Sequence, residues 1–432
     1  MTPHDGTPRD GTPRDGWPHD GSPPRGGSYD GTPYTARPPH GGSTPHPAAT
    51  PLRCAVVGNP GNRRVALYAR AVRAAGLPAP RVVAWRDVLR DGGADFAPDE
   101  VVRLDSPGED AEVDRLLRGP GDPTRVEGSA RWYAGLTAAL RGLRGGIRLD
   151  DPGELAVLFD KRRCHAVLSA AGVPVPASPT SGTGTDAPRV RGWDDVRALM
   201  AEHRMHRLFV KPAHGSSASG VLAVESASGG RIRATTSVEL APDGRLFNSL
   251  KVRRYEDERR IAAVVDALAP DGLHLERWLP KASLDGRAAD LRVVVVAGRA
   301  THAVVRTSTT PLTNLHLGGA RGDLGAVRAA VEAAGARWSD LLGVCEQAAA
   351  CFPGTLCVGV DLLPAVGWRR FAVGEVNAFG DLLPRLTGLP GGGAEGLDTY
   401  AAQVAATLGR FTPAPHPHHP HDTRTGTAHA LA

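Results

Sequence analysis

Two short segments late in the chain carry oxygen-bearing side chains in an otherwise apolar setting. Residues 358–363 predict a strand that contains one acid, Asp361, and residues 371–377 predict a second strand. Glu375 and Asn377 are two residues apart, so they share one face of that strand, and Asp361 can reach the same face from its neighbour. Two carboxylates and an amide oxygen form a hard-oxygen site suited to Mg²⁺ held together with phosphate oxygens. A solvated strand face is the alternative, but both strands are too apolar for an outer face.

A lysine followed by a loop of small residues is the second feature. Lys211 ends a predicted strand, Leu208–Lys211, and the loop that follows runs from Pro212 to Gly220. Backbone N–H groups of such a loop can surround phosphates, while the ammonium group supplies a point charge. The segment is not a Walker A loop, because its lysine precedes the glycines. Taken alone, it could equally be a surface loop.

Two arginines lie on strands that are predicted to be neighbours. Arg292 belongs to the run Asp290–Val296, and Arg306 ends the segment Thr301–Arg306. A three-residue turn at Gly298–Ala300 would place the two arginines directly opposite each other on one sheet face, whereas a register slip of one residue would separate them. Two converging guanidinium groups near a Mg²⁺ site would neutralise a phosphoryl group in transfer. Two exposed strand arginines are the alternative.

The elements that must position these residues alternate between strand and helix patterns. Strand Leu52–Gly58, helix Arg63–Ala75 and strand Arg81–Trp85 predict a parallel α/β unit. Antiparallel strands dominate from Asp290 onward, interrupted by an Ala-rich helix, Leu324–Ala336, and by a second helix. We therefore expect an α/β (α+β) fold.

Composition limits the partners that we expect. The 432 residues include 51 Lys and Arg against 46 Asp and Glu, and the basic residues are dispersed among the acids, which argues against nucleic acid. No apolar run reaches the ~20 residues of a membrane helix, so we expect no membrane partner and a cytoplasmic protein. The Pro/Gly-rich residues 1–50 and the His-rich residues 411–432 have too few aliphatic side chains to offset their chain entropy, which predicts disordered tails.

Seven motifs follow one another between about residues 155 and 390. They are Lys161 at the start of a helix, Lys211 before the Gly/Ser loop, Glu276-Arg277-Trp278-Leu279, Asp290-x-Arg292, Arg306, Asn314 with Gly318-Gly319, and Asp361 with Glu375-x-Asn377. This order resembles that of an ATP-grasp domain, and most of all the RimK and D-alanine–D-alanine ligase branch. The resemblance implies an ATP-grasp fold with an N-terminal α/β pre-ATP-grasp domain (51–154), a lid region (155–275) and a C-terminal lobe with a metal site (276–410).

The resemblance also implies roles for individual residues. Contacts to the phosphates of ATP would come from Lys161, Lys211, His214, Gly215, Ser216, Ser217, Ser219 and Gly220. The hinge beside adenine would consist of Glu276, Arg277, Trp278 and Leu279, with Glu276 at the nucleobase or ribose. Mg²⁺ would be held by Asp361, Glu375 and Asn377. Arg292 and Arg306 would face the γ-phosphate and the acyl-phosphate formed from it, and Asn314 would position the substrate or a metal-bound oxygen.

The activity implied is that of an ADP-forming ligase. It would use Mg-ATP to join an unknown carboxylate to an amine or a thiol through an acyl-phosphate, and relatives of this kind are often homodimers. Two departures leave the acceptor open: an extra segment at about Ile232–Arg253, and Pro280-Lys281 where a glycine is common. A phosphotransferase on the same scaffold and a non-catalytic nucleotide-binding regulatory protein are the alternatives.

Overall fold

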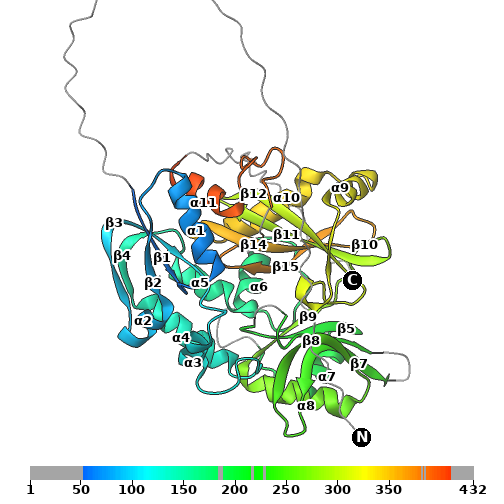
Figure 1. Cartoon of the computed structure of the whole chain (residues 1–432). Coiled ribbons are helices and arrows are strands. Elements are labelled where there is room, and N and C mark those ends of the chain that lie inside the picture. The colour runs from blue at the N-terminus through cyan, green and yellow to red at the C-terminus, as the bar shows by residue number, and fades with distance from the viewer. Residues whose placement is uncertain are drawn as a thin grey trace, which may run out of the picture. The chain divides into compact units, whose positions relative to one another are not determined.

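The structure, a computed structural model, describes residues 52–182, 188–215, 218–226, 230–380, 383 and 386–409. All of them belong to one compact unit, Pro51–Ala432. The tails predicted to be disordered lie outside the described residues. Within this part of the chain the strands form three sheets (Figure 1). None of its helices combines the length and apolar character that crossing a membrane requires.

The first sheet is parallel and confirms the predicted N-terminal α/β unit. Its strand order is β2-β1-β3-β4, with β1 (Arg53–Gly58), β2 (Arg81–Ala84), β3 (Ala94–Leu104) and β4 (Leu143–Arg148). Cys54 and Val56 point to one face and Ala55 and Val57 to the other, and all four are buried, as expected for a sheet covered on both sides. The helices between these strands are α1 (Arg63–Ala74), α2 (Trp85–Asp91), α3 (Ala111–Arg118) and α4 (Ser129–Arg141).

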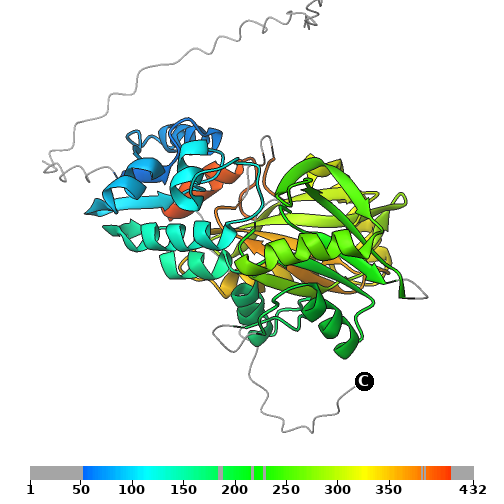
Figure 2. The ribbon, with the colours of Figure 1, turned by 90° about the horizontal axis from the view of Figure 1, so that it is seen from below.

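A helix from the far end of the described chain completes this first layer. α11 (Thr399–Thr407) packs beside α1, and Figures 1 and 2 both show the two helices side by side. Tyr400 and Val404 of α11 join Val56 and Tyr68 in one hydrophobic cluster. Two short helices, α5 (Pro152–Leu158) and α6 (Lys161–Ala170), lead to the second sheet.

The second sheet is antiparallel and has two helices packed on one of its faces. Its order is β8-β7-β6-β5-β9, with β5 (Arg207–Pro212), β6 (Leu222–Ser226), β7 (Ile232–Leu240), β8 (Leu246–Tyr255) and β9 (Leu273–Arg277). Leu208 and Val210 of β5 pack under α7 (Trp193–Glu202) and α8 (Glu258–Leu268). Strand alternation therefore turns Phe209 and Lys211 to the opposite face, away from α7 and α8.

The third sheet is also antiparallel and contains the last strands. Its order is β13-β12-β11-β14-β15, with β10 paired to β11; the bounds are β10 (Ser283–Leu284), β11 (Arg287–Val296), β12 (Arg299–Ser308), β13 (Ala320–Gly322), β14 (Cys357–Pro364) and β15 (Phe371–Asn377). Leu291, Val293 and Val360 face the helices α9 (Leu324–Ala333) and α10 (Trp338–Ala350) in the main core. The residues between them along each strand, among them Arg292 and Asp361, lie on the other face.

The turn between β11 and β12 differs from the prediction. Val296 pairs with Arg299, so the turn consists of two residues, Ala297 and Gly298, instead of the predicted Gly298–Ala300. Both turn residues have positive φ, 48° and 77°, as a type I′ hairpin turn requires. The register then shifts at a β-bulge between Val294 and Val295.

This bulge decides where the two arginines lie. Arg306 pairs with Asp290 and Arg292 pairs with Val304, so the prediction that the arginines are directly opposite each other is wrong. Without the bulge, a two-residue turn would place Arg306 on the face of the sheet that packs on the helices. The extra residue of β12 returns Arg306 to the face that carries Arg292, one diagonal step away.

Candidate active site

One face of the third sheet collects the charged side chains of three strands. Asp361 of β14 lies between Arg292 of β11 and Glu375 of β15 in directly paired positions. Asn377 pairs with Gly359, two residues further along the same face. The sheet register therefore brings together the oxygen-bearing residues that the sequence singled out.

The two arginines converge on the carboxylate of Asp361. Arg292 Nε lies 2.6 Å from Asp361 Oδ1, and Arg306 Nη2 lies 3.1 Å from the same oxygen. Arg306 also donates from Nε to Asp290 Oδ1 at 2.8 Å. Burial by itself would lower the pKa of Arg306, but the carboxylates of Asp361 and Asp290 raise it, so the guanidinium stays charged.

Lys281 and Thr313 extend this network, and no role was predicted for either residue. Lys281 Nζ lies 2.9 Å from Asp290 Oδ2 and donates to Thr313 Oγ1, which itself bonds to Asp290. Burial alone would raise the pKa of Asp290, but Lys281 and Arg306 hold it well below its ordinary value. The two-residue spacing of Asp290 and Arg292 could have indicated that Asp290 shares the sheet face of Arg292. No sequence pattern pointed to Lys281.

The face of the second sheet that is turned away from α7 and α8 supplies the opposite side. Lys211 Nζ donates to Glu276 Oε2 at 2.9 Å, from β5 to the neighbouring β9. Glu276 is buried and Lys211 is largely buried, which would lower the pKa of the lysine and raise that of the acid. Their attraction reverses both effects, since the pKa of Lys211 is raised and that of Glu276 falls to about 2. The pair is fully charged at neutral pH.

Lys161 connects the two sides. It is the first residue of α6, where Asp160 caps the helix by accepting from the N–H groups of Arg162 and Arg163. Its Nζ donates to the backbone oxygen of Gly215 at 2.6 Å and to Glu375 Oε1 at 2.7 Å. Burial would raise the pKa of Glu375, but Lys161 and then Lys211 lower it.

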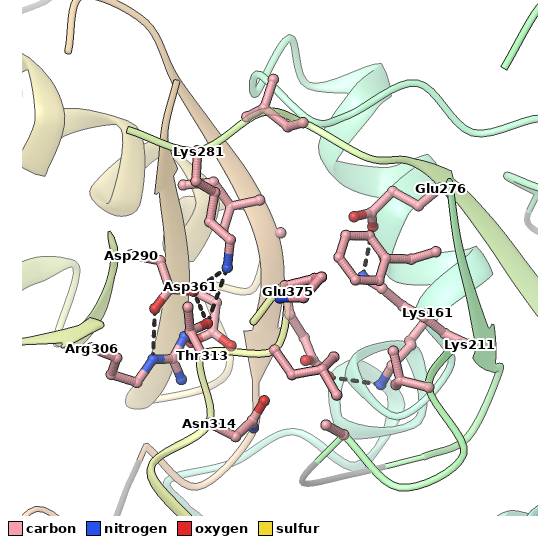
Figure 3. Close-up of a pocket in the computed structure, with 18 of the residues that line it drawn as sticks. Lys161, Lys211, Glu276, Lys281, Asp290, Arg306, Thr313, Asn314, Asp361 and Glu375 are labelled. Atoms are coloured by element: carbon pink, nitrogen blue, oxygen red, sulfur yellow. Dashed lines mark hydrogen bonds and ion pairs between the residues drawn. The ribbon is translucent and has the colours of Figure 1, made fainter. Parts of the chain in front are cut away.

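A pocket lies between these walls, and Figure 3 shows its charged residues in two groups. Arg306, Asp290, Lys281 and Asp361 lie on one side, Lys161, Lys211 and Glu276 on the other, with Glu375 between them. This pocket measures about 110 Å³ and includes apolar side chains of Phe209, Leu279 and Leu363. A larger cavity of about 800 Å³ shares Lys161, Arg306, Asp361 and Glu375 with it and continues past Arg292 and Asn377.

Asn314 lines both cavities from a tightly built loop. Gly318 has a φ of 85°, in the left-handed region that glycine adopts without strain. A Cβ on Gly319 would lie 2.6 Å from the carbonyl oxygen of Thr313, so only glycine fits there. The Gly-Gly pair therefore folds the chain back from Asn314 into β13.

Twelve of the residues predicted for the site line one of these two cavities. They are Lys161, Lys211, Gly215, Ser219, Glu276, Leu279, Arg292, Arg306, Asn314, Asp361, Glu375 and Asn377. Ser216 and Ser217 lie outside the described residues. The functional roles of the twelve residues remain predictions, but the fold brings the twelve together at a common site.

Four predicted residues lie outside both cavities. The imidazole of His214 stacks on Tyr133, with ring centroids 4.0 Å apart, and Nδ1 lies 3.1 Å from the backbone oxygen of Phe159. Arg277 is exposed and donates to the backbone oxygen of His203. Trp278 packs on Phe209 and under Arg207, as expected for hinge packing. Gly220 has a φ of 73° and closes the loop against Pro212. Loop direction, which spacing does not reveal, accounts for the position of His214.

The donor set at β14 and β15 fits a hard divalent cation. No group of three or more His, Cys, Asp or Glu side chains that could hold a metal is found in the described residues. Asp361, Glu375 and Asn377 offer two carboxylates and one amide, which suits a cation that takes its other oxygens from phosphates and water. The amide nitrogen of Asn377 donates to Gly359 O at 3.4 Å, which orients the amide on this face.

Three solved structures align with most of the chain. They are "ATP-grasp ligase PsnB complexed with minimal precursor" (16% identity, 84% of this chain and 100% of that chain, TM-score 0.44), "D-cycloserine synthetase DcsG" (16%, 83% and 99%, TM-score 0.48), and "macrocyclase MdnC bound with precursor peptide MdnA from Microcystis aeruginosa MRC" (11%, 83% and 99%, TM-score 0.44). No protein-family model and no curated protein matches the chain. The functional assignment below rests on the residues of this chain.

Proposed function

We propose that the protein is an ATP-grasp ligase that uses Mg-ATP to activate a carboxylate and join it to an amine or a thiol. One observation carries the proposal: Lys161 Nζ lies 2.7 Å from Glu375 Oε1, although the two residues are 214 positions apart. The contact unites the lysines, which suit phosphates, with the carboxylates, which suit Mg²⁺, in one pocket.

The pocket has distinct regions for the parts of ATP. Phe209, Leu279 and Leu363 offer apolar surface for the adenine ring, with Glu276 nearby for a polar contact. Lys161 and Lys211 would hold the phosphates. The bound Mg²⁺ would be held by Asp361, Glu375 and Asn377, and it would offset phosphate charge.

The proposed reaction needs no side-chain nucleophile. An oxygen of the acceptor carboxylate attacks the γ-phosphorus, the bond to the β–γ bridging oxygen breaks, and ADP leaves with the electron pair. The nitrogen of the amine, or the sulfur of the thiol, then attacks the acyl carbon, the carbon–oxygen bond breaks, and phosphate leaves, taking up the proton released by the nucleophile. Arg292 and Arg306 would stabilise the charge on the phosphoryl group, so catalysis consists of positioning and charge neutralisation.

A screen of small carboxylic acids and amines tests the proposal. ADP release should rise with the right acceptor, and hydroxylamine should trap the activated acid as a hydroxamate in place of the product. A stable phosphoester with no hydroxamate would point to a phosphotransferase instead. A protein that never releases ADP or AMP with any combination of acids and amines would point to a nucleotide-binding regulator. Arg337→Gln, at an exposed ion pair with Asp340, is the matched control that should behave like the parent.

A further inference from the structure

Arg321 is a cation of the larger cavity without a partner in the described part of the chain. Its side chain is exposed, and no hydrogen bond or ion pair connects it to another described residue. It lines the cavity of about 800 Å³ but not the smaller pocket that Lys211, Glu276 and Leu279 line. Its charge therefore faces the region beyond the proposed nucleotide site.

The register of β13 places this cation with respect to the reaction. Arg321 pairs directly with Arg306, so the two side chains share a sheet face and their Cβ atoms are about 5 Å apart. Like charges in directly opposite positions destabilise a sheet. Arg306 is offset by Asp290 and Asp361, which lie 2.8 Å and 3.1 Å away, whereas Arg321 has no such carboxylate.

The chain is held in this arrangement by the loop described above. Gly318 adopts a φ that other residues rarely take, and Gly319 has no room for a Cβ, so the loop returns to the sheet at a fixed register. Arg321 is thus fixed in register beside Arg306 although its own side chain is exposed. An unpaired guanidinium at a fixed position near a reacting centre suits an anionic group of a ligand.

We propose that Arg321 binds a second anionic group of the acceptor, an inference that rests on the proposed ligase function. The substrate is then a short dianionic acid: one carboxylate is activated beside Arg306, and the other anionic group pairs with Arg321. Because the two arginines are nearest neighbours across the sheet, only a few bonds separate the two groups, as in succinate. The cavity of about 800 Å³ has the size of a small-molecule site.

Binding measured without ATP tests the inference separately from turnover. The full chain is titrated by calorimetry with succinate, with butyrate as the four-carbon monoacid, and with 3-phosphonopropionate as the phosphonate analogue. The parent should bind succinate at least about tenfold more tightly than butyrate, as expected for one charge-assisted bidentate contact. The phosphonate shows whether a carboxylate or a phosphate-like group is preferred, and tighter binding of either dianion than of butyrate supports the proposal.

Two variants of the arginine complete the test. Arg321→Gln should lose the preference for the dianion, and Arg321→Lys should keep part of it. Arg328→Gln, at an exposed ion pair on α9, is the matched control and should keep it in full. The inference is overturned if neither dianion binds more tightly than butyrate, or if Arg321→Gln keeps the preference. A protein that shows the preference but never releases ADP would contradict the ligase function instead.

Discussion

The two ends of the active-site region differ in how their charges are balanced. At the enclosed end, Lys211 has Glu276 at 2.9 Å and Lys281 has Asp290 at 2.9 Å; both acids are buried and both lysines are largely buried. At the open end, Arg321 is exposed and has no partner in the described residues, and Leu250 of β8 is 73% exposed. The enclosed end thus has its charges neutralised within the protein, whereas the open end offers charge and apolar surface to a ligand.

This difference separates two tasks. A buried cation that is paired with a carboxylate stays charged and in place, and it can receive a triphosphate without a large rearrangement. An exposed cation costs little to solvate and discriminates between ligands by what they offer it. We expect substitutions at the enclosed end to affect every reaction of the protein, and those at the open end to affect acceptor choice.

The largest effect is expected from Lys211→Met. It removes a phosphate contact and leaves the carboxylate of Glu276 buried without its lysine, so ADP release should fall about 10³-fold and stability should fall by about 3 kcal/mol or more. The double variant Lys211→Met/Glu276→Gln removes the unpaired charge as well. Its thermal midpoint should recover while ADP release stays low. Recovery of ADP release in the double variant would show that the lysine acts only through stability.

Asp361→Asn should come next. The substitution weakens the proposed metal site and removes the negative charge shared by Arg292 and Arg306, so ADP release should fall at least about 10²-fold. The Mg²⁺ concentration that gives half of the remaining rate should rise as well. Asp340→Asn, at an exposed ion pair on α10, is the control. An unchanged Mg²⁺ requirement would contradict the assignment of Asp361 to the metal.

A third prediction concerns His274, which lies on the same strand as Glu276, the partner of Lys211. Burial lowers the pKa of His274 from 6.5 to about 4, so its contribution to stability is complete above pH 6.5 and is lost as the pH falls towards 4. The loss amounts to about 3 kcal/mol. Burial raises the pKa of Asp150 to about 6, and this opposes the trend over the same range. The difference in unfolding free energy between the parent and His274→Gln isolates the contribution of the histidine. If the unfolding free energies of the two proteins change with pH in parallel, His274 is not buried in its neutral form.

The smallest effect is expected at the open end. Leu250→Ser replaces a side chain that is 73% exposed, so stability should change by less than about 0.5 kcal/mol. Nucleotide affinity should stay within about twofold of the parent, because Leu250 lines the larger cavity and not the smaller pocket. A clear loss of nucleotide affinity, measured by titration with Mg-ADP, would mean that the two ends are not separate.

Local patterns predicted most of the elements. The apolar residues before the small-residue loop indicated a strand that ends at Lys211, and the two-residue spacing of Glu375 and Asn377 indicated a shared face. Both features depend only on local sequence, and the second follows directly from the strand period. The order of the motifs then identified most of the residues that line the site.

Features that depend on one extra residue or on tertiary position were not predictable. The β-bulge after Val294 changes the partner of Arg306, and no pattern in the local sequence predicts this bulge. His214 turns towards Tyr133, which comes from another part of the chain. The position of Arg321 beside Arg306 depends on the pairing of the short strand β13 with β12. In each case the deciding contact joins segments that no spacing rule connects.

The fate of a labelled oxygen tests the central claim most directly. The acceptor found in the screen is prepared with ¹⁸O in its carboxylate, and the released phosphate is examined by ³¹P NMR during turnover with ATP and Mg²⁺. Activation through an acyl-phosphate predicts that one ¹⁸O atom appears in each phosphate released. Phosphate that contains no ¹⁸O while product accumulates would contradict it.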